Sequence, residues 1–105
     1  MHPDKVSRDR LNRFTDLPNV GPAFAKDLTL LGFSKPQDLA GQDARDLFDR
    51  LTEVSGQRQD PCVLDVFLSL VDFADGGRPR AWWEYTAQRK LDYPEVSLNY
   101  RAEEA

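Results

Sequence analysis

One short segment of the sequence, Leu17–Ala23, has the residue types of an anion-binding turn. Pro22 is well suited to the first position of a helix, where its missing N–H is not needed. The residues before it must reverse the chain, and Asn19 and Gly21 are the two that accept positive φ most readily. The first backbone N–H groups of a helix have no partner within it and carry the positive end of its dipole. We therefore expect the amides of Gly21 and Ala23 to bind a phosphate group.

Basic side chains accompany this segment. Lys26 lies in the same predicted helix, and Arg13 and Arg10 precede the turn. Three basic side chains neutralise only a few phosphates. Binding to a DNA backbone is therefore expected to be weak, independent of base sequence and sensitive to salt. Leu17 and Val20 are expected to point back between the helices and hold the turn. The predicted nucleic-acid-binding residues are Arg10, Arg13, Asn19, Val20, Gly21, Ala23 and Lys26.

The other reactive side chains lack the partners that catalysis requires. The aspartates form no compact cluster in the sequence with an adjacent base, so a two-metal nuclease site is not expected. The one histidine, His2, lies at the N-terminus, which leaves no Cys–His pair and no His/Cys metal site. Cys62 begins a predicted helix, where the dipole can lower the pKa of a thiol, but burial statistics favour a small buried apolar residue. We expect no catalytic activity, no metal and no cofactor.

Three aromatic residues near the C-terminus, Trp82, Trp83 and Tyr85, are of the kind that stacks on bases. Adjacent residues of a helix point about 100° apart, so the two tryptophans cannot share one platform. We expect one tryptophan to anchor the last helix to the core and the other to lie at its edge.

Caps and turn residues divide the chain into short helices. Gly32 is placed to end one helix in the left-handed conformation, and Asp43 and Asp60 are placed to cap the two longest helices. No segment alternates polar and apolar residues with period two, so no sheet is expected. The sequence predicts an all-α, compact bundle of five or six short helices in a single domain, residues 1–90, followed by a tail, residues 91–105, that is either loose or packed as an extended segment. The helices are expected at residues 8–16, 22–31, 34–39, 43–55, 60–75 and 79–90.

Composition limits the classes of partner. The chain of 105 residues has a formal net charge of −4, which argues against strong overall attraction to nucleic acid. The charge is uneven, because residues 1–35 hold six basic and four acidic side chains and residues 36–77 hold three and nine. A single cysteine fits a reducing compartment, and the N-terminus has no apolar segment typical of a signal peptide. The most apolar stretch, residues 63–72, is too short and too acidic to span a bilayer, so we expect a cytoplasmic protein with no membrane partner.

The segment Leu17–Ala25, with Gly32 after it, resembles the hairpin of helix-hairpin-helix proteins. Their pattern is apolar-x-Gly-apolar-Gly between two short helices, and Asn19 here replaces the first glycine. Together with residues 56–67 and Trp82-Trp83, it is similar to small bacterial proteins of the pathogenicity-locus family, some described as mitomycin-resistance proteins, over about residues 10–85. The hairpin is also similar to the C-terminal domain of the TfoX competence regulators. The resemblance implies contact with the DNA backbone and a monovalent cation held by hairpin carbonyls.

The residues and motifs of the sequence are consistent with two functions. The first is a non-catalytic module that binds the DNA backbone. The second is a protein-interaction module whose acidic middle binds a basic partner, or whose apolar patch with a tryptophan binds another subunit. Val54-Ser55-Gly56 precedes the Asp60 helix as a degenerate second hairpin, but Glu53, Asp60 and Asp65 surround it with negative charge.

Overall fold

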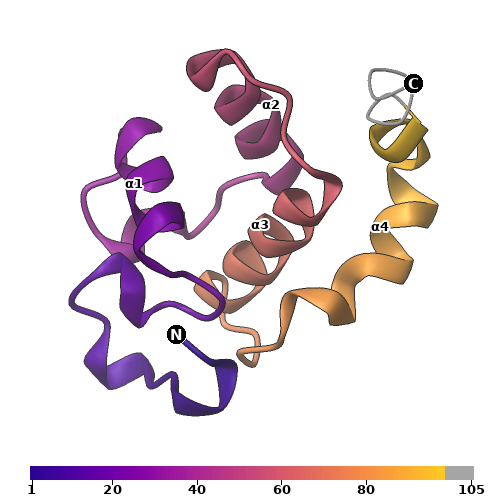
Figure 1. The fold of residues 1–105 in the computed structure, drawn as a ribbon. Coiled ribbons are helices and arrows are strands. Elements are labelled where there is room, and N and C mark those ends of the chain that lie inside the picture. Colours follow the sequence, from indigo (N-terminus) through magenta and orange to yellow (C-terminus); the bar gives the residue numbers. More distant parts are fainter. Residues whose placement is uncertain (99–105) are drawn as a thin grey trace.

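The computed structural model describes residues 1–98, and every regular element in that range is helical, so the predicted all-α class is confirmed (Figure 1). Within these residues no helix has the length and apolar character needed to cross a membrane. The α-helices are α1 (Pro22–Leu30), α2 (Ala44–Ser55), α3 (Pro61–Ala74) and α4 (Thr86–Asp92), and residues 94–98 are also helical. Short 3₁₀ helices connect them: η1 (Pro3–Lys5), η2 (Arg8–Arg10), η3 (Phe14–Asp16), η4 (Pro36–Leu39) and η5 (Trp82–Tyr85).

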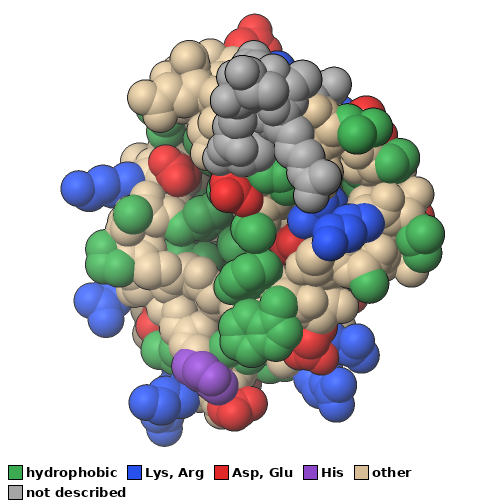
Figure 2. All heavy atoms as spheres, turned by 45° about the vertical axis from the view of Figure 1, so that its right-hand side comes forward, with side chains coloured by type: hydrophobic (Ala, Val, Ile, Leu, Met, Phe, Trp, Pro, Cys, Tyr) green, Lys and Arg blue, Asp and Glu red, His purple; other side chains and the backbone are tan. Residues whose placement is uncertain are grey.

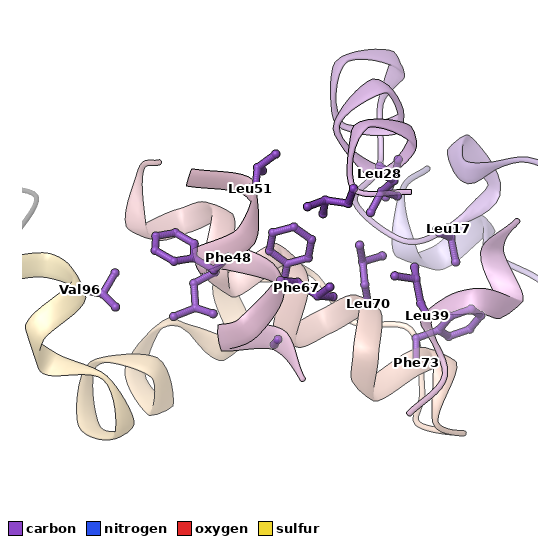
Figure 3. Packing of buried hydrophobic residues seen from close by; sticks show 14 residues of the cluster. Leu17, Leu28, Leu39, Phe48, Leu51, Phe67, Leu70, Phe73 and Val96 are labelled. Atoms are coloured by element: carbon purple, nitrogen blue, oxygen red, sulfur yellow. The ribbon is translucent and has the colours of Figure 1, made fainter. Parts of the chain in front are cut away.

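Helix α3 runs through the middle of the molecule, with α1 on one side and α4 on the other (Figure 1). The Asp60 carboxylate caps its start by accepting a hydrogen bond of 2.8 Å from the amide of Cys62, as predicted. Its inward face buries Leu64, Phe67 and Phe73 almost completely. Figure 3 shows the apolar cluster extending along α3 from Leu17 at one end to Val96 at the other. Helix α3 therefore packs against α2, α4, η4 and η5.

The sequence also predicted the ends of α1 and α2 correctly. The Asp43 carboxylate accepts a hydrogen bond of 3.0 Å from the amide of Asp46 at the start of α2. Gly56 directly follows α2 and Gly32 follows the C-cap of α1, and the two glycines adopt positive φ of 69° and 98°. Glycine takes this left-handed conformation without strain, so both helices end where the glycine allows the chain to turn away.

The predicted helix over residues 8–16 is wrong. The segment forms η2 and η3, because the Asp16 carboxylate accepts hydrogen bonds of 2.9 Å from the amides of Asn12 and Arg13, which competes with helical pairing. Arg8 also ties the segment to the end of α3. Its guanidinium lies 4.1 Å from the centre of the Phe73 ring and donates to the carbonyls of Phe73 and Gly77. Tertiary contacts thus override the apolar spacing.

The predicted helix over residues 79–90 begins later than expected, as η5 followed by α4. The preceding chain is held extended because the Arg80 carbonyl accepts hydrogen bonds from the side chains of Asn19 and Ser69. Part of the predicted tail is packed, since Val96 is buried and the Ser97 hydroxyl accepts a hydrogen bond of 2.7 Å from Arg89. The rest of that predicted tail, residues 99–105, lies outside the described residues.

Candidate nucleic-acid interface

The turn that precedes α1, residues Leu17–Gly21, has type II character. The Val20 amide donates to the Leu17 carbonyl at 3.4 Å, Pro18 occupies the second position, and Asn19 at the third position has φ 67°. Leu17 and Val20 are buried, as expected for residues that hold the turn. The expectation of positive φ at Gly21 is wrong: its φ is −98° and it is extended, because the turn requires left-handed φ at its third residue only.

The Asn19 side chain performs a role that the sequence did not predict. Its Nδ2 donates to Ser69 Oγ and to the Arg80 carbonyl, both at 2.9 Å, and its Oδ1 accepts from the Trp82 amide at 3.3 Å. Asn19 therefore has two structural roles: its backbone tolerates positive φ, and its side chain joins the turn to α3 and to the start of η5. The one signal in the sequence was an asparagine where the helix-hairpin-helix pattern has glycine.

The amides at the start of α1 are exposed to solvent. The first helical hydrogen bond, 3.0 Å, joins the Ala25 amide to the Gly21 carbonyl, and Pro22 has no N–H. Gly21 and Ala23 are exposed, and their amides have no hydrogen-bond partner among residues 1–98. They are thus free to donate to an anion at the positive end of the helix dipole.

An open groove of about 500 Å³ lies between η3 and α1; Pro22, which stands between the two amides in the chain, lines it, and Gly21 and Ala23 do not. Arg13, the residue just before η3, lines it on one side, and Pro22 and Lys26 line it from α1, so two of the predicted basic residues face the same space. None of the described residues that line it is acidic. Arg10 lies in η2 and does not line this groove, so the structure brings Arg13 and Lys26 together but leaves Arg10 apart.

Two nearby carboxyl groups have their own environments. Hydrogen bonds from the amides of Arg13 and Asn12 lower the pKa of Asp16, and its carboxylate is directed at those amides. Burial raises the pKa of Asp27, because desolvation disfavours its charged form. Neither lines the groove, so Arg13 and Lys26 supply its charge.

The carbonyls of this turn already face a positive group. The amino group of Met1 donates to the carbonyls of Leu17 and Val20 at 3.0 and 2.8 Å, and burial lowers the pKa of that amino group. Two carbonyls that converge on an ammonium group form a site that suits a cation. The monovalent cation implied by the resemblance stays a prediction, and among the described residues no cluster of His, Cys, Asp and Glu suits a metal ion.

The remaining candidate residues have structural surroundings. Burial raises the pKa of the Cys62 thiol, which disfavours the reactive thiolate. At the segment considered as a degenerate second hairpin, Gly56 ends α2. The Asp60 carboxylate accepts the hydrogen bond of the Cys62 amide, so that amide is not available to an anion. Trp83 is 60% exposed, so one tryptophan lies at the edge, as predicted. Trp82 is half-buried, and its role as an anchor of the last helix to the core stays a prediction.

The fold and the site define a small helical protein with an exposed helix start beside a basic groove. The chain belongs to the family described as Cdd1, pathogenicity locus, whose model matches residues 7–91. It is 41% identical over 76 residues to the mitomycin resistance protein McrB of Streptomyces lavendulae, and the match covers 72% of each chain. No solved structure matches the chain.

Proposed function

We propose that the protein is a non-catalytic module that binds the DNA backbone through a helix-hairpin-helix formed by η3, the Leu17–Gly21 turn and α1. The observation that carries this proposal is the pair of unpartnered amides at Gly21 and Ala23, on either side of Pro22, which lines a groove together with Arg13 and Lys26. A phosphate diester fits such a site, because it accepts hydrogen bonds from both amides and is attracted by the basic side chains.

The small number of charges sets the expected affinity. Phosphate contacts carry no information on base identity, so recognition would be independent of sequence. Two basic side chains and one helix start release few counterions, so the complex would be weak and would dissociate as salt rises.

This proposal predicts how Lys26→Ala and Arg13→Ala change the salt dependence of binding. Each variant is expected to weaken binding to a labelled blunt duplex and to reduce the slope of log affinity against log salt by about one. Fluorescence anisotropy over a salt series measures both quantities. Both side chains are on the surface, so thermal unfolding should stay close to that of the wild type.

Lys90→Ala is the matched control, because Lys90 is an exposed lysine in the last turn of α4, outside the groove. It removes the same charge and should leave the slope unchanged. An equal effect from Lys90→Ala would point to general electrostatic attraction and not to the groove. A wild-type protein that binds no duplex even at low salt would overturn the proposal and favour a protein partner for the acidic middle of the chain.

A further inference from the structure

The exposed indole of Trp83 contacts the Trp82 ring, and hydrogen bonds of the residues on either side hold its segment of the chain. The half-buried Trp82 ring meets it edge-on, with centroids 5.7 Å apart and an interplanar angle of 84°. Glu84 accepts a hydrogen bond of 3.0 Å from the Ala81 amide at the start of η5, and Tyr85 donates one of 2.6 Å to Asp72. Trp83 is thus an exposed aromatic ring on a fixed support, which is unusual for a residue that gains so much from burial.

Trp83 lines a pocket of about 440 Å³ with Arg78 and Arg80. We call this the Trp83 pocket. Both arginines are exposed and neither forms an ion pair within residues 1–98. Asp4 and Glu84 also line the pocket: Glu84 accepts from the Ala81 amide, whereas the Asp4 carboxylate is 89% exposed and pairs with neither arginine. The pocket therefore offers an aromatic face and two guanidinium groups that have no carboxylate partner.

The Trp83 pocket is joined directly to the turn before α1. Asn19 bonds to the Arg80 carbonyl and to the Trp82 amide, on either side of Ala81. Figure 2 shows the face turned toward α4, where a hollowed strip of apolar side chains ends beside the histidine, which also lines this pocket. The turn and the segment that carries the pocket are therefore connected through the Asn19 side chain.

The chemistry of the pocket suits a nucleotide with an unpaired base. A base stacks on an exposed indole whatever its identity, and arginine binds the phosphate beside it. Bases within a duplex are already stacked on one another, so they cannot use this ring. We propose that the Trp83 pocket binds an unpaired nucleotide of a single-stranded DNA tail next to the duplex, a proposal that rests on duplex binding at the Leu17–Gly21 turn.

The test compares one labelled duplex in two forms, blunt and with a tail of about six thymidines. The wild type is expected to bind the tailed form about tenfold more tightly by fluorescence anisotropy at low salt. Trp83→Ala should remove this preference and leave affinity for the blunt duplex unchanged, and Trp83→Phe should keep part of it. Leu91→Ala, which removes another exposed apolar side chain, 76% exposed on α4, should keep all of it.

Tryptophan fluorescence gives a second measurement on the same samples. The tailed duplex is expected to quench the wild type more than the blunt duplex does, and Trp83→Phe, which retains Trp82, should lose that difference. Equal affinity of the wild type for the two forms would overturn the pocket proposal while leaving duplex binding intact. Failure to bind either form would overturn the proposed function itself, and the pocket proposal with it.

Discussion

Arg89→Ala is expected to lower the free energy of unfolding by about 3–5 kcal/mol, because it leaves a charge buried without its partner. Asp65 on α3 is 0% exposed and Arg89 on α4 is 3% exposed. Arg89 Nε lies 2.9 Å from Asp65 Oδ1, and the Thr86 hydroxyl donates to Asp65 Oδ2 at 2.8 Å. Urea unfolding followed by tryptophan fluorescence measures the loss, which is a large fraction of the stability of a domain this size.

The control for this prediction is Asp49→Ala. Asp49 pairs with Arg45 one turn away on α2, and its side chain is 57% exposed. Exposed pairs contribute little, so the urea midpoint should move only slightly. The double variant Asp65→Leu with Arg89→Met leaves no buried charge and is expected to recover part of the loss. Equal, small effects of Arg89→Ala and Asp49→Ala would contradict the assignment of the buried pair as the link between α3 and α4.

Asn19→Ala is expected to destabilise the protein by about 2.5–6.5 kcal/mol, for two separate reasons. The substitution removes the three side-chain hydrogen bonds to Ser69, Arg80 and Trp82, each of which contributes about 0.5–1.5 kcal/mol. It also places alanine at φ 67°, a conformation that costs a residue with a Cβ about 1–2 kcal/mol. Thermal and urea unfolding measure the sum.

Asn19→Gly separates the two reasons. Glycine restores the residue of the helix-hairpin-helix pattern and removes the backbone strain, so the variant should be more stable than Asn19→Ala by about 1 kcal/mol and less stable than the wild type. If Asn19→Gly were as stable as the wild type, the bridge from the turn to η5 would contribute nothing. The structural role assigned to the asparagine side chain would then be wrong.

The sequence predicted those parts of the fold that depend on local signals. Asp43 and Asp60 cap α2 and α3, and Gly32 and Gly56 end α1 and α2. These features depend on hydrogen bonds and dihedral angles within a few residues, so residue type and spacing are sufficient to predict them. The burial of Leu17 and Val20 also followed from spacing around the turn.

The features that the sequence did not predict depend on contacts between distant residues. Nothing in the local sequence pairs Asp65 with Arg89, or Asn19 with Arg80, because these partners meet only after the helices have packed. The same holds for Arg8, which ties η2 to the end of α3, whereas the Asp16 carboxylate replaces the expected helix through local bonds to the amides of Asn12 and Arg13.

The features of the candidate site also fall into those that local sequence predicts and those that depend on contacts between distant residues. The exposed amides of Gly21 and Ala23 follow from Pro22 at the first position of α1, which is a local signal. The joining of Arg13 and Lys26 in one groove, and the separation of Arg10 from it, depend on how η3 folds against α1. The connection of the turn to the Trp83 pocket depends on the Asn19 side chain and required the structure.

The central claim is that a backbone amide at the start of α1 donates to a DNA phosphate, and Gly21→Pro compared with Gly21→Ala tests it most directly. Gly21 has φ −98° and no atom within 4 Å of an added Cβ, so alanine fits as it stands, whereas proline requires φ to move toward about −65° and also removes the N–H. Hydrogen bonds to a charged group contribute about 1.5–3 kcal/mol, so proline is expected to weaken duplex binding at least tenfold relative to alanine. Anisotropy with the blunt duplex at low salt measures the ratio, and equal affinities of two folded variants would contradict the claim.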